Sequence, residues 1–183
     1  MQVYDEVPPI GAHIKFCQRL PHDCQKDDRG SARVEMTAQR WSELDQINRY
    51  VNRFIVPTTE MELYGVRDYW AYPDERRRGD CNAYTLLKRK MLAAAGWPLS
   101  SLLITVVVVQ NGEGHAILTV RTNEGDFVLD NLNEDILPWY KAPYQFLMRQ
   151  SSADPHAWLS LVPPRRFSPV EVGGAPNSTK LPR

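Results

Sequence analysis

Residues 80–98 read DCNAYTLLKRKMLAAAGWP, which is the pattern of one helix that begins at a cysteine. Asp80 is a favourable N-cap residue, whereas Gly96 and Pro98 are typical of a helix end and of the residues just after it. Apolar side chains recur at helical spacing, as Leu86, Leu87, Met91, Leu92 and Ala95. We therefore expect Cys81 to be the first residue of a helix whose apolar face packs in the core.

Cys81 occupies a position that favours chemistry. A thiol at the start of a helix lies near the positive end of the helix dipole and near unpaired backbone N–H groups, so we expect a lowered pKa. A cysteine with only a packing role would more naturally lie in the middle of the helix, as Leu87 does. Position alone leaves both roles open.

Three strands are expected after this helix, over residues 102–110, 116–121 and 126–130. The segments between them, 111–114 and 122–125, have the length and the glycines of hairpin turns. Because the first strand is almost entirely apolar and β-branched, we expect it to be buried on both faces. A cysteine-led helix packed on an antiparallel sheet is an α+β fold.

The second hairpin brings a histidine close to an aspartate. We expect the hairpin to close with Thr122 opposite Gly125. Asp130 then lies across from Ile117, on the face of the sheet that also carries His115. Such diagonal neighbours are roughly 7–8 Å apart at the backbone, which lets their side chains hydrogen-bond. A slip of one residue would place them on opposite faces, so the prediction depends on this register.

Cys81, His115 and Asp130 together have the chemistry of a catalytic triad. A thiolate attacks a carbonyl, an imidazole moves the proton, and a carboxylate holds the imidazole in the required tautomer. The backbone N–H of Cys81 offers one donor to an oxyanion. Trp70 and Gln46 are the candidates for a second donor, and the sequence does not choose between them.

The rest of the domain is predicted from helical spacing and turn residues. Residues 37–55 have the spacing of an amphipathic helix that is capped by Thr37 and stopped by Pro57. Residues 57–80 are expected to be a loop. The aromatic residues that follow Pro138 are expected to form a helix or a loop packed on the sheet.

Residues 1–36 are expected to be an irregular N-terminal arm that is held by its cysteines. Cys17 and Cys24 are close together, whereas Cys81 stands alone, and this distribution favours one disulfide and one free thiol. His13 and His22 lie beside the pair, so a zinc site is an alternative, although its spacing matches no familiar zinc module. Two reduced, buried cysteines are the remaining alternative.

The overall composition limits the class of protein. The chain has 183 residues, enough for one domain, which we assign to residues 37–165, followed by a disordered tail over residues 166–183. Twenty-two basic residues balance twenty-two acidic ones, which argues against a nucleic-acid partner. We find neither a membrane span nor a signal peptide in this sequence.

Three blocks of sequence carry a family resemblance. The blocks are Asp68-Tyr69-Trp70 through Arg78-Gly79-Asp80-Cys81-Asn82-Ala83-Tyr84, then Leu87-Lys88-Arg89 with Ala95-Gly96-Trp97-Pro98, and then Gly112-Glu113-Gly114-His115-Ala116 with Thr119-Val120-Arg121 and Gly125-Asp126-Phe127-Val128-Leu129-Asp130-Asn131. In this order and spacing they resemble the bacterial transglutaminase-like cysteine proteinases (BTLCP), which have a papain/transglutaminase-like fold. The Cys-His-Asp triad of that family falls on Cys81, His115 and Asp130.

The resemblance also carries expectations about biology. It implies a hydrolase of the periplasm, with a leader already removed, that cleaves a protein substrate such as a surface adhesin in the control of biofilms. It further implies an inner-membrane receptor as a regulatory partner. The chemistry of the triad requires no cofactor, but family members bind calcium beside the nucleophile. Asp80 matches that pattern, whereas Asn82 replaces an acid, so we expect a weakened calcium site and assign no metal ligand.

Two other functions fit the same residues. Acyl transfer to an amine uses the same triad, as in transglutaminases and arylamine N-acetyltransferases. A non-catalytic binding module could keep the scaffold without activity. Competition between water and an amine acceptor would distinguish the peptidase from the transferase.

Overall fold

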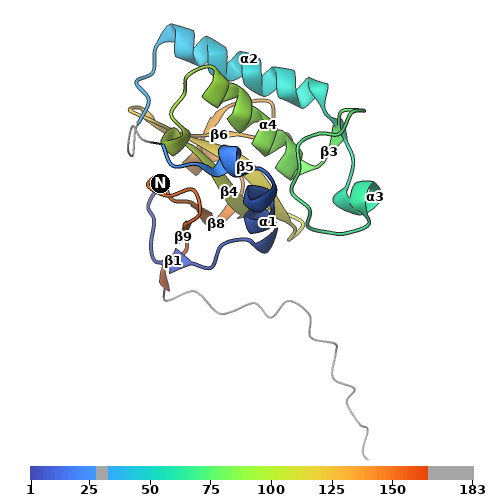
Figure 1. Ribbon diagram of the computed structural model, residues 1–183. Coiled ribbons are helices and arrows are strands. Elements are labelled where there is room, and N and C mark those ends of the chain that lie inside the picture. Colours follow the sequence, from blue (N-terminus) through green and yellow to red (C-terminus); the bar gives the residue numbers. More distant parts are fainter. Residues whose placement is uncertain (28–32, 165–183) are drawn as a thin grey trace, which may run out of the picture.

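A computed structural model describes residues 1–27 and 33–164 of the chain, and within them one antiparallel sheet has the strand order β1-β9-β8-β4-β5-β6-β7 (Figure 1). The sheet strands are β1 (Glu6–Val7), β4 (Leu102–Val108), β5 (Gly114–Thr122), β6 (Gly125–Leu129), β7 (Leu137–Pro138), β8 (Gln145–Gln150) and β9 (Trp158–Ser160). The helices are α1 (Gly11–Arg19), α2 (Ala38–Phe54), α3 (Glu60–Tyr64) and α4 (Cys81–Ala94). A separate parallel pair joins β2 (Val56–Pro57) to β3 (Arg78–Gly79).

The helix α4 lies between α2 and the sheet (Figure 1). It begins at Cys81 with Asp80 as its N-cap, as predicted, and Gly96 follows it with a φ of +85°. The buried surface of α4 is wider than the predicted apolar stripe, because the helix is covered on two sides. Lys88 and Arg89 are buried, whereas Ala95, which we assigned to the stripe, is exposed.

The helix α2 also forms where its spacing predicts. It runs from Ala38 to Phe54, and the Thr37 side chain caps it by accepting a hydrogen bond from the Arg40 backbone N–H at 3.2 Å. Leu44 and Val51 are fully buried against the layer below. The apolar spacing therefore predicted both the element and its inward face.

The register of the second hairpin is the predicted one. Thr122 pairs with Gly125, and Leu118 pairs with Leu129 farther from the turn. Strand β4 lies inside the sheet between β5 and β8, which explains its long apolar run. Its residues 102–105 are buried, and only Val106 and Val108 are half-buried.

The prediction for the residues after Pro138 is wrong in part. Only Trp139–Lys141 is helical, as a short 3₁₀ turn (η3), and the chain then forms strands β8 and β9. The sequence of β8, QFLMRQ, has neither helical spacing nor clean alternation. It forms a strand because β4 offers a free edge with backbone partners. The aromatic residues of this region cover the sheet face that carries Val107, Ile117 and Val128.

The prediction of an irregular N-terminal arm is also wrong. Residues 11–19 form α1, β1 pairs with β9, and a 3₁₀ turn (η1) covers Pro21–Cys24. Ala12 and Phe16 are buried in a cluster that includes Trp70 and Trp158. The helix was missed because its apolar face is short and only tertiary contacts stabilise it. The predicted tail at 166–183 lies outside the described residues.

In the predicted loop at 57–80, a short helix and the β2–β3 pair were missed. A capping box starts α3, because Thr59 and Glu62 bond each other's backbone N–H groups. Strand β3 leads directly into Asp80 and α4, so this pair helps to position the cysteine.

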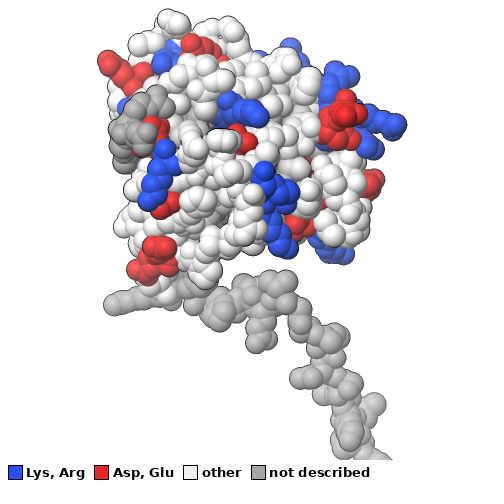
Figure 2. All heavy atoms as spheres, viewed as in Figure 1, with Lys and Arg blue, Asp and Glu red and all other residues white. Residues whose placement is uncertain are grey.

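The surface agrees with the balanced composition. Basic and acidic side chains are interspersed on the face shown in Figure 2, and no large area there carries one sign of charge. Within residues 1–27 and 33–164, no helix is both long and apolar enough to cross a bilayer.

Candidate active site

Cys81 lies at the first turn of α4, where the cap and the sheet both hold it. The Asp80 carboxylate accepts hydrogen bonds from the backbone N–H groups of Asn82 at 3.1 Å and Ala83 at 3.4 Å. On the sheet side, the Ala116 backbone N–H lies close enough to the Cys81 thiol to lower its pKa. The Thr85 hydroxyl, one turn along α4, donates to the Ala116 carbonyl at 3.0 Å. The thiol is therefore fixed against the strand that carries His115.

His115 and Asp130 meet as the hairpin register predicts. The His115 Nε2 and the Asp130 Oδ1 are 2.8 Å apart, and both side chains are buried. A carboxylate only accepts hydrogen bonds, so Nε2 carries the proton and donates it to Asp130. The other ring nitrogen, Nδ1, is then the one with a free lone pair.

Three side chains from other parts of the chain hold Asp130. The Tyr144 hydroxyl donates a hydrogen bond to its Oδ2, and the Tyr144 ring also packs edge-on against His115. The Asp130 backbone carbonyl accepts from Lys88 on α4 at 2.8 Å and from Asn52 on α2 at 2.9 Å. Both the carboxylate and the main chain of this residue are therefore fixed in position.

These contacts set the charge state of the buried groups. Burial alone raises the pKa of Asp130, but the hydrogen bonds from His115 and Tyr144 outweigh it and hold the pKa below its usual range. Burial lowers the pKa of Lys88 to about 7, and the charge of Asp130 opposes part of that decrease. Asp130 is therefore an anion at neutral pH.

The pKa of Cys81 differs from our expectation. Burial raises it to about 12, the charges of Asp80 and Glu60 add to the increase, and the Ala116 and Asn82 N–H groups oppose it. These N–H groups lower the pKa of Cys81, as expected for the start of a helix. Their effect is smaller than the increase in pKa caused by desolvation and by the two neighbouring carboxylates. In the structure as it stands, the resting form is a thiol.

Cys81 and His115 open into a common cleft. Both line a cavity of about 490 Å³ that is bounded by β2 and α3 on one side and by residues 109–115 and 131–132 on the other. Both also line an adjoining cavity of about 250 Å³, which Glu60, Asp68 and Trp70 enclose. A substrate in these cavities would reach the sulfur and the imidazole together.

The structure distinguishes the two candidates for the second oxyanion donor. Trp70 lines the smaller cavity with Cys81. Gln46 lies on the exposed side of α2, bonds to Ser42 at 2.8 Å, and lines neither cavity. The expectation for Gln46 is therefore wrong, because the position of α2 turns that side chain away from the cleft.

Two carboxylates and an amide lie beside the cysteine. Glu60 from α3 accepts hydrogen bonds from the Asn82 amide at 3.0 Å and the Tyr69 N–H at 2.8 Å. The same Asn82 amide lies 3.3 Å from the Asp80 carboxylate. Burial raises the pKa of both Glu60 and Asp80, and the charge of Asp80 raises the pKa of Glu60 further. Sequence reasoning missed Glu60, because α3 was read as loop.

The two other cysteines lie away from this cleft. Cys17 and Cys24 form a disulfide in the structure, and Cys81 is free. His13 packs beside the Cys17 sulfur at 3.5 Å, whereas His22 is exposed and bonds to Gln25. Because the two sulfur atoms are bonded to each other, they do not act as thiolate ligands for a metal.

A sequence comparison assigns the chain to a family. The profile of a family described as bacterial transglutaminase-like cysteine proteinase, BTLCP, matches residues 4–166. The chain belongs to this family. The family resemblance and the α+β, transglutaminase-like fold expected from the sequence are confirmed, and this BTLCP member is a cysteine protease.

Solved structures agree with the assignment to BTLCP. Legionella pneumophila LapG aligns with a TM-score of 0.54 and 26% identity, over 65% of this chain and 68% of LapG. Calcium-bound LapG from the same organism aligns with a TM-score of 0.56 and 22% identity, over 80% of this chain and 87% of that one. No curated protein gives a significant match to the chain.

Proposed function

We propose that this protease uses Cys81 as nucleophile, His115 as general acid and base, and Asp130 as the group that orients His115. The observation that carries the proposal is the 2.8 Å contact between the His115 Nε2 and Asp130 inside a cleft that Cys81 also lines. Because Nε2 is bound to the carboxylate, Nδ1 is the nitrogen that takes the thiol proton.

The reaction follows from these roles. Nδ1 of His115 takes the proton as the Cys81 sulfur attacks the peptide carbonyl, and the oxyanion accepts hydrogen bonds from the Cys81 N–H and a Trp70 donor. The imidazolium then protonates the leaving amine, and a thioester remains. His115 next deprotonates a water molecule, which hydrolyses the thioester to the carboxylic acid and restores the thiol. Asp130 remains an anion and stabilises the imidazolium.

The family resemblance supports a biological setting for this reaction. The proposed substrate is a surface adhesin in the periplasm, and the proposed regulatory partner is an inner-membrane receptor. The open cleft of about 490 Å³ is compatible with an extended protein segment.

Calcium is the cofactor whose chemistry fits the cluster beside Cys81. Glu60 and Asp80 supply carboxylate oxygen atoms, which calcium prefers, and burial disfavours the charge of both carboxylates when no cation is near. A bound calcium ion would supply positive charge beside the nucleophile. Glu60, Asp80 and Asn82 also hold the start of α4, through the Asp80 cap and the hydrogen bond from the Asn82 amide to Glu60.

The calcium proposal has a readout that is independent of activity. Calcium should raise the melting temperature, and Glu60→Gln should reduce that increase and weaken binding in calorimetry by roughly tenfold or more. Glu62→Gln is the matched control, because Glu62 caps α3 but does not contact Asn82. Equal calcium responses in all three proteins would exclude this ligand set.

The triad is tested by substitution and cleavage. Cys81→Ala should abolish cleavage of a candidate adhesin, and His115→Ala should reduce kcat/KM by roughly 10³-fold or more. Asp130→Asn should retain more activity than Asp130→Ala, because an amide oxygen can still accept from Nε2. The melting temperature of Cys81→Ala should stay nearly unchanged. Full cleavage by Cys81→Ala would refute the assignment, and an amide product formed with an added amine would instead indicate acyl transfer.

A further inference from the structure

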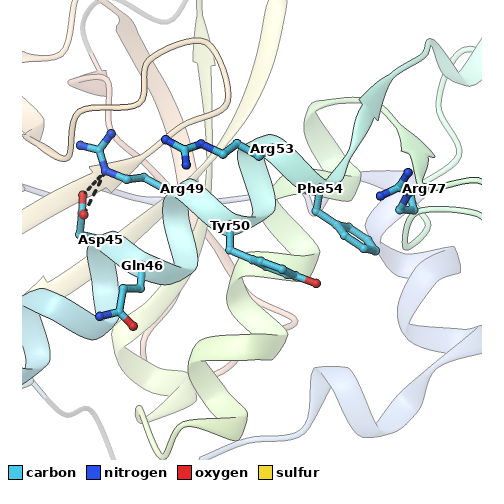
Figure 3. A pocket seen from close by; sticks show the side chains of 7 residues that line it. All are labelled: Asp45, Gln46, Arg49, Tyr50, Arg53, Phe54 and Arg77. Atoms are coloured by element: carbon cyan, nitrogen blue, oxygen red, sulfur yellow. Dashed lines mark hydrogen bonds and ion pairs between the residues drawn. The ribbon is translucent and has the colours of Figure 1, made fainter.

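Another cavity lies away from the triad, along the exposed side of α2. This groove of about 510 Å³ is lined by six residues of α2 and by Arg77 from the turn before β3 (Figure 3). The residues of α2 are Asp45, Gln46, Arg49, Tyr50, Arg53 and Phe54. Figure 3 shows Arg49 and Arg53 on one side of the helix, and Phe54 directed toward Arg77. The groove thus combines guanidinium groups with aromatic rings.

The arginines of the groove differ in their partners. Arg49 bonds both oxygens of Asp45, at 2.9 and 3.0 Å, and also Glu134 at 3.1 Å. Arg53 lies 4.0 Å from Glu134, and 71% of its side chain is exposed. Arg77 has no carboxylate within ion-pair distance among residues 1–27 and 33–164. Arg53 and Arg77 are therefore the cations that remain available to a ligand.

The two aromatic rings form a platform beside Arg77. Tyr50 and Phe54 stack with their centroids 5.4 Å apart, and Tyr50 is 50% exposed. The Arg77 guanidinium lies 5.5 Å from the centre of the Phe54 ring. Such a surface accepts the aliphatic part of a side chain while a guanidinium binds its charged end.

The backbone of Arg77 is strained, and this strain points to a role for its side chain. Arg77 has a φ of +62°, and its N–H closes a turn onto the Asp74 carbonyl at 2.8 Å. Glycine or asparagine is usual at such a position, and another residue costs about 1 kcal/mol or more. The turn would form more easily with glycine. The arginine therefore lowers stability while it places a cation at the end of the groove.

The groove leads toward the nucleophile. The Arg77 carbonyl accepts from the Val56 N–H at 2.7 Å, and the β2–β3 pair then runs on to Pro57 and Gly79, which line the catalytic cleft. Cys81 follows Arg77 by four residues. At the rise of a strand, this spacing is at most about 13 Å, which an extended peptide spans with about four residues.

We propose that this groove is a substrate subsite that binds an acidic side chain about four residues from the scissile bond. The inference rests on the proposed peptidase function and extends it to a class of substrate. The ligand is a carboxylate, because a guanidinium such as that of Arg77 pairs with a carboxylate in a planar, bidentate geometry. The substrate residues between this acidic side chain and the scissile bond then lie along the β2–β3 pair toward Cys81.

The cleavage test uses a library of proteome-derived peptides and sequencing of the cut sites. The wild-type protein should prefer Asp or Glu at three to six residues from the cut, on one side of it. Arg77→Gly should still cleave peptides. The ratio of kcat/KM for a Glu peptide to kcat/KM for its Gln counterpart should fall roughly tenfold in this variant. Arg77→Gly should also melt at the same temperature as wild type or higher, because it relieves the positive φ.

The matched control is Arg76→Ala, which removes a neighbouring exposed arginine that does not line the groove. This variant should keep the acidic preference. A wild-type profile with no acidic enrichment, or an equal loss in Arg76→Ala and Arg77→Gly, would overturn the subsite.

A binding test separates failure of the subsite from failure of the proposed function. The probes are fluorescein-labelled peptides of alternating Glu and Leu, or Gln and Leu, titrated against Cys81→Ala, which cannot complete the reaction. The Glu peptide should bind roughly tenfold more tightly than the Gln peptide. In the double variant Cys81→Ala/Arg77→Gly, the two peptides should bind with equal affinity. Equal binding of both peptides would refute the subsite even if cleavage is observed, whereas selective binding without cleavage by wild type would refute only the triad.

Discussion

At the scale of single residues, Asp130 depends on a partner that local sequence does not indicate. Its carboxylate accepts from His115 at one oxygen and from Tyr144 at the other, while Lys88 and Asn52 hold its carbonyl. Tyr144 follows Asp130 by fourteen residues and comes from the segment that covers the opposite side of the sheet from α4. It acts through Asp130, so its role is positional.

Tyr144→Phe should therefore change the pH profile as well as the rate. The hydroxyl lowers the pKa of Asp130, so its removal should raise that pKa and move the acid limb of kcat/KM to higher pH. We expect kcat to fall roughly tenfold, since one orienting hydrogen bond is lost. The measurement is kcat/KM between pH 4 and 8.

The control for this variant is Tyr140→Phe. Tyr140 is 69% exposed and makes no contact with Asp130. If both variants show the wild-type acid limb, Tyr144 does not set the charge of Asp130.

At the scale of elements, the start of α4 is positioned by a close approach to β3. A Cβ at Gly79 would lie 2.4 Å from the Ala83 Cβ, which is far inside van der Waals contact, and 3.6 Å from Ile55. The absence of a side chain at Gly79 lets strand and helix pack directly, two residues before the nucleophile. The local sequence predicted a loop here, and the contact between Gly79 and Ala83 arises only from packing.

Gly79→Ala should move the start of α4 and destabilise the protein by about 1–3 kcal/mol, the usual range for overpacking. Cleavage should fall as well, because Cys81 moves with the helix. Thermal unfolding and kcat/KM measure the two effects.

The double variant Gly79→Ala/Ala83→Gly tests whether the contact with Ala83 is the cause. It removes the methyl group that the new Cβ would meet, at a helix cost of about 1 kcal/mol. Activity should recover relative to Gly79→Ala. A double variant that stays as inactive as the single one would show that the clash is elsewhere.

At the scale of the whole molecule, the N-terminal segment is part of the core. His13 on α1 is 2% exposed, and it lies against Trp70 and Trp158, which come from distant parts of the chain. Gln150 on β8 contacts the His13 ring at 3.1 Å. Burial lowers the pKa of His13 to about 4, and the charges of Arg89 and His156 add to the decrease.

This buried histidine predicts loss of stability in mild acid. In the unfolded chain His13 binds a proton below about pH 6.5, whereas in the folded chain it stays neutral until the pH falls to about 4. The unfolded state therefore binds more protons in this window, and the free energy of unfolding should fall by roughly 3 kcal/mol from pH 7 to pH 4 on account of this group. Urea unfolding at several pH values measures the slope.

His13→Gln should flatten that slope, because glutamine does not titrate. His22→Gln, which changes an exposed histidine on the same segment, should keep the wild-type slope. An unchanged slope in His13→Gln would assign the acid sensitivity to other groups.

The sequence by itself determined the elements that depend on local order. Helical spacing with caps predicted α2 and α4, and the turn at residues 122–125 predicted the register that brings His115 to Asp130. These signals are local, because a cap or a two-residue turn acts within a few residues of itself.

Only the tertiary structure decided what depends on distant segments. Pairing with β4 made β8 a strand, and the same fold brought Tyr144 to Asp130 and Glu60 to Asn82. The high pKa of Cys81 has the same origin, since burial and carboxylates from separate elements outweigh the start of its own helix. Desolvation and charge act through space, so they become defined only when the chain has folded.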